Sequence, residues 1–150
     1  MINEGGAVEI DGNGTLLATR SAILNSNRNP GMTQLQAEAN FKKYLGTTHF
    51  IWLDGKAGRE ITDMHIDGFA RCIQEDYVNE NLLFLGTEKG LYITVDGGKN
   101  WSKFENNMPA VAVMHLDLHK KTNDLVMATH GRGVIILDDV SVLRQVTNEI

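Results

Sequence analysis

The stretch from residue 33 to residue 53, TQLQAEANFKKYLGTTHFIWL, decides the fold of the first half of the chain. It opens with Thr-x-x-Gln, the form of a capping box, so we expect a helix to begin after Thr33. Apolar residues then recur at steps of three and four, which predicts one buried helix face as far as Leu45, and Gly46 is a suitable stop. The run from His49 to Leu53 is dense in β-branched and aromatic residues, which predicts a buried strand.

The segments on either side of this helix and strand also have the pattern of strands. Residues 7–10 and 15–18 flank Asp-Gly-Asn-Gly, whose Asp-Gly and Asn-Gly steps favour tight hairpins. Farther along, the alternation in residues 64–71 predicts a strand with His65, Asp67 and Phe69 on one face. The first half therefore has the element order of an α+β unit: strand, strand, helix, strand.

The second half has a different pattern, with short apolar runs and Gly-rich turns and without a helix signal. Such regular spacing predicts antiparallel β structure. The layout of residues 83–93 is echoed in residues 126–136, which implies two copies of one sheet unit. The predicted strands are 82–85, 91–95, 111–118, 125–128 and 134–137.

Composition and charge exclude several classes of protein. The 150 residues are 42% apolar and 22% charged, an ordinary globular composition. With 14 Lys and Arg against 19 Asp and Glu, the net charge of −5 argues against nucleic acid as a partner. No segment has the apolar length of a membrane span, and the N-terminus lacks the pattern of a secretory signal, so a cytoplasmic location is favoured. The single cysteine, Cys72, excludes an internal disulfide framework and a thiolate-rich zinc site.

Some residues outside the first half could have a chemical role, but each also has a structural explanation. His115 and His119 lie four apart, which on a strand is about 13 Å and too far to share a metal ion. Residues 130–133, His-Gly-Arg-Gly, could bind an anion, although a tight turn explains both glycines. Aromatic residues at 92, 101 and 104 could form a carbohydrate platform or pack within the fold. We predict no metal and no cofactor.

A set of separate motifs in the first half resembles agmatine deiminase and the bacterial peptidylarginine deiminases. The motifs match in order and approximate spacing over about seventy residues: Glu4-Gly5-Gly6, 11–17 (DGNGTLL), 24–30 (LNSNRNP), 44–46 (YLG), 51–53 (IWL) and 61–71 (ITDMHIDGFAR). The resemblance implies a pentein fold, in which strand-strand-helix-strand modules surround a central site. It also implies hydrolysis of a guanidinium group to a ureido group and ammonia.

The same resemblance assigns roles to three residues. His65 matches the histidine that moves protons to the leaving ammonia and from the hydrolytic water. Asp67 and Glu4 match carboxylates that bind the planar substrate cation. The family's nucleophilic cysteine lies in a Gly-rich segment far downstream, and a further substrate-binding aspartate lies upstream; these 150 residues contain neither segment. Cys72 directly follows the His-x-Asp motif and cannot take the role of nucleophile, so we expect the chain alone to be inactive.

The second half resembles the Asp-box repeats of sortilin-type and glycosidase-type β-propellers, also known as BNR repeats. Residues 94–101, TVDGGKNW, match the Ser/Thr-x-Asp-x-Gly-x-x-Trp pattern of that turn, with Thr94, Asp96, Gly98 and Trp101 at its fixed positions. The resemblance covers about residues 73–140, and it implies a structural device in which the aspartate ties down a hairpin.

We therefore expect an α+β, mostly β chain: a partial pentein deiminase segment in residues 1–72, followed by propeller-blade strands in residues 73–150. Its expected function is that of a fragment of a guanidino-group deiminase, with agmatine or peptidyl arginine as the partner if a site is completed. The alternative is a binding or assembly module without enzymatic activity, which associates through open sheet edges.

Overall fold

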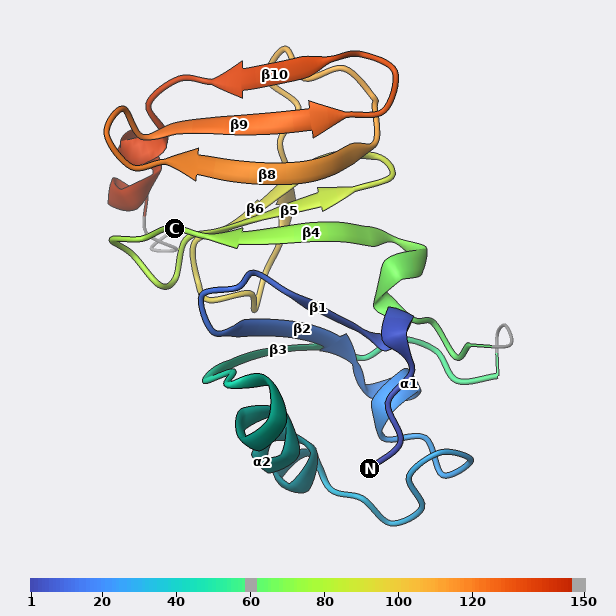
Figure 1. The fold of residues 1–150 in the computed structure, drawn as a ribbon. Helices are drawn as coiled ribbons and strands as arrows, with labels where there is room; N and C mark the ends of the chain where they lie inside the picture. The colour runs from blue at the N-terminus through green and yellow to red at the C-terminus, as the bar shows by residue number, and fades with distance from the viewer. Residues whose placement is uncertain (59–61, 147–150) are drawn as a thin grey trace. The chain divides into compact units, whose positions relative to one another are not determined.

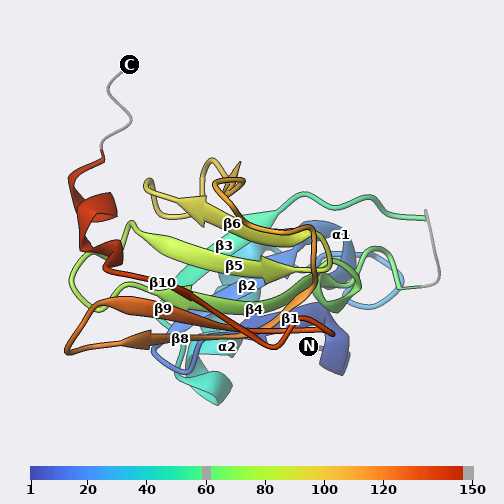
Figure 2. The same cartoon turned by 90° about the horizontal axis from the view of Figure 1, so that it is seen from above.

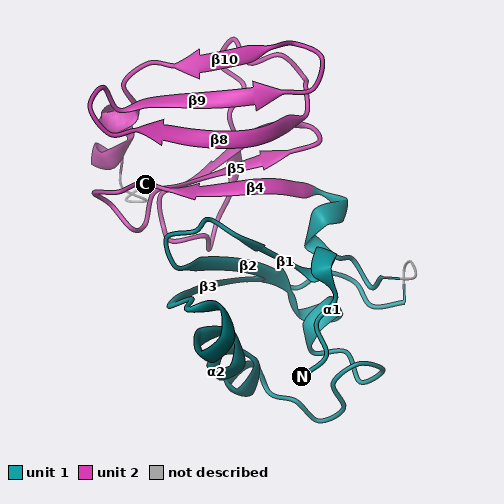
Figure 3. Cartoon of the chain, in the orientation of Figure 1, with its two compact units in different colours: residues 1–69 teal, residues 70–150 magenta. Residues whose placement is uncertain are grey.

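The computed structural model describes residues 1–58 and 62–146. The chain divides into two compact units, Met1–Phe69 and Ala70–Ile150 (Figure 3).

Unit 1 contains a three-stranded sheet and one long helix (Figure 1). In the sheet order β1-β2-β3, β1 is antiparallel to β2 and β2 is parallel to β3. The predicted order of strand, strand, helix and strand is present, with a short helix added after β2. The elements are η1 (Gly5–Ala7), β1 (Val8–Ile10), β2 (Thr15–Thr19), α1 (Arg20–Ile23), α2 (Gln34–Leu45), β3 (His49–Leu53) and η2 (Ile66–Gly68).

Helix α2 begins and ends where the sequence predicts. The Thr33 hydroxyl accepts a hydrogen bond from the Gln36 N–H, and the Gln36 side chain accepts one from the Thr33 N–H, which completes the capping box. At the other end Gly46 adopts a left-handed conformation with φ 71°. Only the first part of the predicted face is buried: Phe41 packs in the core, whereas Tyr44 is 70% exposed.

The core of unit 1 lies between α2 and the sheet. Phe41 and Trp52 bring their ring centroids within 6.3 Å, and the Trp52 indole N–H donates to Glu38 at 2.8 Å, so helix and sheet are fixed by both apolar and polar contacts. The buried members of this cluster are Ala7, Leu16, Ala18, Ala22, Ile23, Ala37 and Phe41.

The predicted strand over residues 64–71 is wrong. The structure instead has a single 3₁₀ turn, η2, and a strand, β4, that begins only at Ala70. Asp63 and Met64 both have positive φ, at 56° and 63°, a conformation that an extended strand does not contain. His65 and Asp67 therefore lie on a tight turn and do not share a strand face.

Unit 2 is built from two antiparallel sheets, with orders β4-β5-β6-β7 and β10-β9-β8 (Figure 1). The short helix η3 lies at one end of these sheets (Figure 2), and its first N–H donates to the Asn123 carbonyl. The elements are β4 (Ala70–Glu75), β5 (Leu83–Thr87), β6 (Gly90–Thr94), β7 (Ser102–Lys103), β8 (Val113–His119), β9 (Asp124–Thr129), β10 (Val134–Leu137) and η3 (Val140–Gln145).

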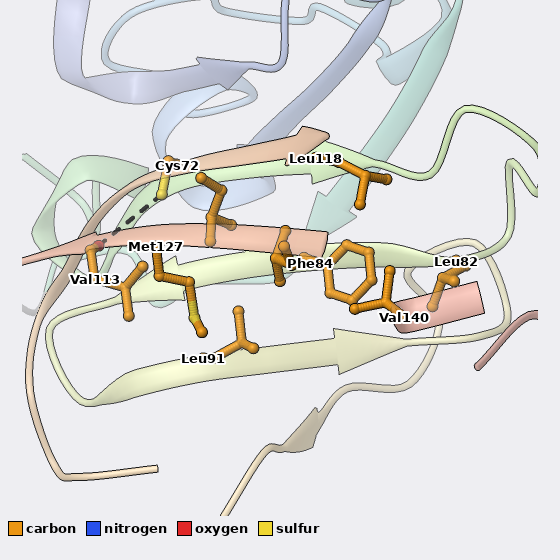
Figure 4. Packing of buried hydrophobic residues seen from close by; sticks show 10 residues of the cluster. Cys72, Leu82, Phe84, Leu91, Val113, Leu118, Met127 and Val140 are labelled. Atoms are coloured by element: carbon orange, nitrogen blue, oxygen red, sulfur yellow. Dashed lines mark hydrogen bonds between the residues drawn. The ribbon is translucent and has the colours of Figure 1, made fainter. Parts of the chain in front are cut away.

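One apolar core joins the two sheets of unit 2 (Figure 4). Phe84 and Leu91 from the first sheet pack in the same cluster as Met127 from the second. Cys72 belongs to this cluster, and its thiol lies 3.9 Å from the Val113 carbonyl oxygen. The described strands of unit 2 form two sheets, of four and three strands, and these two sheets do not close into a propeller ring.

Candidate functional site

Four charged or titratable side chains from three separate segments meet in unit 1. His65 Nε2 lies 2.6 Å from Glu4 Oε2, and Arg28 Nε donates to the same oxygen at 2.7 Å. Arg28 Nη1 donates to Asp63 Oδ2 at 2.5 Å. The side chains of His65, Arg28 and Asp63 are 10%, 15% and 10% exposed, whereas that of Glu4 is 44% exposed, so solvent reaches these contacts from the Glu4 side. We call Glu4, Arg28, Asp63 and His65 the ionic cluster.

The backbone around Asp63 is held by hydroxyl groups at the end of β2 and the start of α1. Thr19 Oγ1 donates to the Met64 carbonyl at 2.7 Å, and Ser21 Oγ donates to the Asp63 carbonyl at 2.6 Å. The Gly58 N–H donates to Asp63 Oδ1 at 2.6 Å. These bonds stabilise the two consecutive left-handed residues and fix the direction in which the chain enters the turn that carries His65.

Hydrogen bonds within the cluster favour the ionised carboxylates. The bonds from His65 and then Arg28 hold the pKa of Glu4 below its ordinary value. The Gly58 N–H and then Arg28 hold the pKa of Asp63 below its ordinary value, and the two carboxylates raise the pKa of Arg28. The cluster therefore contains two carboxylates and one guanidinium around an imidazole at neutral pH.

This arrangement defines the tautomer of neutral His65. An ionised carboxylate only accepts hydrogen bonds, so the contact with Glu4 requires a proton on Nε2 of the imidazole. The other ring nitrogen, Nδ1, then carries the lone pair. A neutral imidazole held in this way can take up a proton at Nδ1 and release it again, the property that a general acid–base group needs.

Asp67 lies beside the Glu-Gly-Gly segment. A Cβ atom at Gly6 would come within 2.2 Å of Asp67 Oδ2, so the carboxylate occupies the space that any larger residue would need. Asp67 is exposed to solvent. Burial, and then the charge of Asp67, raise the pKa of the neighbouring Glu9 carboxyl. The structure thus brings Glu4 and His65 into direct contact and places Asp67 against Gly6, two residues from Glu4.

Sequence reasoning missed the contribution of two members of the cluster. Arg28 and Asp63 lie within the quoted motifs but had no predicted role. They are 35 residues apart, and Arg28 is 24 residues from Glu4. No periodic pattern connects positions at such separations, because the contacts depend on how the two loops return to the end of the sheet. The only feature in the sequence that could have pointed to this contact is the opposite charge of the two residues, each of which lies in a polar loop.

The predicted Asp-box residues form a compact loop in unit 2. Thr94 Oγ1 donates to Asp96 Oδ1 at 2.7 Å and accepts from the Gly98 N–H at 3.1 Å. The Asn100 N–H donates to Asp96 Oδ1, and the Trp101 indole N–H donates to the Gly98 carbonyl. These side-chain-to-backbone bonds tie the loop between β6 and β7 into one conformation.

Asp96 stays ionised over almost the whole pH range. Partial burial opposes its ionisation, but hydrogen bonds from Thr94, Asn100 and Lys99 outweigh it and lower its pKa to about 2. The contacts of Asp96 with Thr94 and Asn100 lie within this loop, which is consistent with a structural role.

The remaining chemical candidates are found in ordinary structural positions. His115 and His119 lie on β8, and residues 130–133 form the turn between β9 and β10. Within residues 1–58 and 62–146, no group of three or more His, Cys, Asp or Glu side chains is arranged to hold a metal ion. Over the same residues, none of the helices is long and apolar enough to cross a membrane.

Comparison with known families decides the relationship of the first half. The model of the Porphyromonas-type peptidyl-arginine deiminase family matches residues 1–82, more than half of the chain. The chain belongs to this family. The match includes every member of the ionic cluster, and it runs past the predicted boundary at residue 72 to the end of the loop before β5.

Individual relatives match over a similar range. A protein of Yersinia pestis is 51% identical over 67 residues, which cover 45% of this chain and 18% of the relative. The agmatine deiminase of Pseudomonas aeruginosa is 41% identical over 66 residues, covering 44% and 18%. The solved structure of a substrate-bound agmatine deiminase of C. jejuni is 34% identical, with a TM-score of 0.41, and the match covers 45% of this chain and 20% of that chain. The chain spans about a fifth of the length of the curated relatives it matches.

These comparisons support the predicted pentein relationship of the first half. They give no support to the propeller repeats predicted for residues 73–140, which stay a prediction from the sequence pattern.

Proposed function

We propose that residues 1–82 contribute part of the active site of a guanidine-hydrolysing deiminase, with agmatine or peptidyl arginine as the substrate. The observation that carries the proposal is the 2.6 Å contact between His65 Nε2 and Glu4 Oε2, in a segment that belongs to a deiminase family. This contact prepares the imidazole for proton transfer at Nδ1.

In the proposed reaction a cysteine thiolate attacks the guanidinium carbon and expels one nitrogen as ammonia, after which water displaces the thiolate to leave the ureido product. His65 delivers the proton that the departing nitrogen needs and takes one from the attacking water, so each cycle consumes one water and restores the imidazole. Asp67 holds the planar cation by accepting hydrogen bonds from its N–H groups.

The contacts of Glu4 support a role different from the one that the resemblance suggested. Its Oε2 atom already accepts hydrogen bonds from His65 and Arg28. We therefore infer that Glu4 positions the imidazole, and that Asp67, which lies exposed beside Gly6, is the carboxylate that meets the substrate.

The 150-residue chain on its own should not turn over substrate. Its one cysteine, Cys72, lies buried in β4, where its thiol contacts the Val113 carbonyl. Burial among apolar side chains disfavours the thiolate form that the reaction requires. Because nucleophile and proton carrier act as a unit, His65 alone leaves little catalysis.

Binding and turnover can be measured separately on the purified chain. We expect no ammonia release from agmatine, but we expect agmatine to perturb the NMR signals of residues 4–6 and 65–67. The Asp67→Asn variant should lose this perturbation, and butylamine, which has an amine but no guanidine, should not produce it. Ammonia release that His65→Ala abolishes would overturn the inactivity of the isolated chain. Unchanged signals with saturating agmatine would overturn the guanidinium site itself.

A second candidate function is assembly through an open sheet edge, as the sequence analysis anticipated. The observation that favours it is the edge strand β10, where Val134 and Ile136 are 63% and 56% exposed.

A further inference from the structure

Strand β10 leaves one edge open in unit 2. It pairs with β9, and no other described strand pairs with it (Figure 1). Its sequence, Val-Ile-Ile-Leu, contains no charge, proline or glycine that would discourage a further strand from adding to the sheet.

The register with β9 shows which backbone groups face the open edge. The Thr129 N–H donates to the Gly133 carbonyl, so residues 129 and 133 form a hydrogen-bonded pair. Pairs alternate along an antiparallel ladder, so Ile135 and Leu137 are bonded to β9, whereas Val134 and Ile136 are in non-bonded positions. The N–H and C=O groups of Val134 and Ile136 therefore point away from β9.

The other edges of unit 2 are less suited to pairing. Strands β4 and β8 lie side by side, so these two sheet edges face each other. Strand β7 has only two residues, one of which is Lys103, and a short edge strand with a lysine is a common protection against pairing. Strand β10 is thus the edge of unit 2 that is both accessible and unprotected.

We propose that β10 pairs antiparallel with β10 of a second copy of this chain, with Val134 opposite Ile136 of the other copy. Both residues present their N–H and C=O groups outward, so each such pair exchanges two hydrogen bonds. The two-fold axis passes through Ile135, and the pairing joins two three-stranded sheets into one of six strands. This proposal makes the assembly function specific and does not depend on deiminase chemistry.

Charges at the ends of β10 select this orientation and register. Arg132 precedes the strand and Asp138 follows it, and both are exposed. When Val134 is opposite Ile136, the end of β10 next to Arg132 in each copy lies beside the end next to Asp138 in the other. Two Arg–Asp pairs then form at the ends of the paired strands, whereas a parallel arrangement would place like charges together.

The outer face of the sheet adds an apolar contribution. Val126 and Ala128 of β9 lie opposite Ile136 and Val134 and on the same face. In the pair of chains these side chains would form one continuous apolar strip across the new strand boundary, where each β-branched residue packs against a partner on the neighbouring strand.

Sedimentation equilibrium of the full 150-residue chain tests the proposal. We expect a reversible monomer–dimer equilibrium. Ile136→Pro removes an N–H that β9 does not use, so it should abolish the dimer and leave the circular dichroism of the monomer unchanged. Arg132→Asp and Asp138→Arg should each weaken association by about tenfold, because each replaces two attractive pairs by two repulsive ones. The Arg132→Asp, Asp138→Arg double variant should restore the original affinity.

Lys121→Asp is the matched control, because it reverses an exposed charge away from β10 and should leave association unchanged. A monomer at millimolar concentration, a dimer that Ile136→Pro does not affect, or a double variant that associates no better than the single ones would each overturn the proposal. Association into open-ended aggregates would also overturn it, since a two-fold pairing of β10 is closed.

Discussion

Substitutions at Gly5 and Gly6, before β1, test whether Gly6 leaves the space that the Asp67 carboxylate occupies. In Gly6→Ala the new Cβ would lie 2.2 Å from Asp67 Oδ2, whereas ordinary contact begins at 3.4 Å, so the carboxylate must move by at least 3.4 − 2.2 = 1.2 Å. Such a displacement forces the Asp67 side chain away from its rotamer, at a cost of about 0.5–1.5 kcal/mol. We expect the variant to fold and to lose the response of Asp67 to agmatine.

Gly5→Ala is the matched control, because a Cβ at Gly5 would have no atom within 4 Å. Neither glycine has a positive φ, so both substitutions should gain about 0.4–1 kcal/mol from the reduced entropy of the unfolded chain. Gly6→Ala should therefore be roughly 1 kcal/mol less stable than Gly5→Ala. Urea unfolding, followed through the amide NMR signals of unit 1, measures the difference. Equal stability together with an unchanged Asp67 carboxyl signal would refute the reasoning.

Three further outcomes follow from the ion pairs. Arg28→Gln should raise the pKa of both Glu4 and Asp63, because it removes a hydrogen bond that lowers each of them; carboxyl ¹³C titration measures this change. In the unchanged chain, the ionised Glu4 and Asp63 contribute their full share of the free energy of unfolding above pH 4.5. This contribution is lost as the pH falls through the lowered pKa values of the two groups in the folded state, and acid unfolding of unit 1 measures the loss. Asp76→Ala should destabilise unit 2 by roughly 3–5 kcal/mol, because the fully buried carboxylate accepts hydrogen bonds from both Nε and Nη2 of Arg144.

Two exposed pairs supply the controls. Arg20→Gln removes a cation that pairs with a 91% exposed Asp54, and it should leave the titration of the ionic cluster unchanged. Lys103→Ala breaks a 3.5 Å pair with Glu105 and should cost less than about 1 kcal/mol. If Arg20→Gln changed the pKa values of Glu4 and Asp63 as much as Arg28→Gln does, the hydrogen bonds from Arg28 would not be the cause of the lowered values.

Local signals in the sequence were enough to predict most of the regular structure. The capping box at Thr33 and the left-handed Gly46 fix both ends of α2 through neighbouring residues, so both can be identified from the sequence. The five predicted strands of the second half also correspond to β5, β6, β8, β9 and β10, with ends that differ by no more than two residues. Apolar runs bounded by turn residues carry that information without tertiary contacts.

The turn that carries His65 could not be predicted in the same way. Residues 64–69 alternate like a strand, but hydroxyl groups of Thr19 and Ser21, more than 40 residues away, hold the backbone of Met64 and Asp63 in a left-handed conformation. The alternation in the sequence was therefore overridden by distant contacts. The family resemblance pointed to Glu4 and His65. The sequence could not show that they are in contact, because this contact depends on the same turn.

The shared oxygen of Glu4 also determines what an arriving ligand encounters. Arg28 has the same guanidinium group as the proposed substrate, and its side chain donates hydrogen bonds to both Glu4 and Asp63. This internal cation pairs with both the buried Asp63 and the 44% exposed Glu4, so we expect the exposed Asp67 to be the carboxylate that attracts a ligand cation. If Asp67 meets the ligand as proposed, a high salt concentration should weaken ligand capture while the largely buried Arg28–Asp63 pair stays intact.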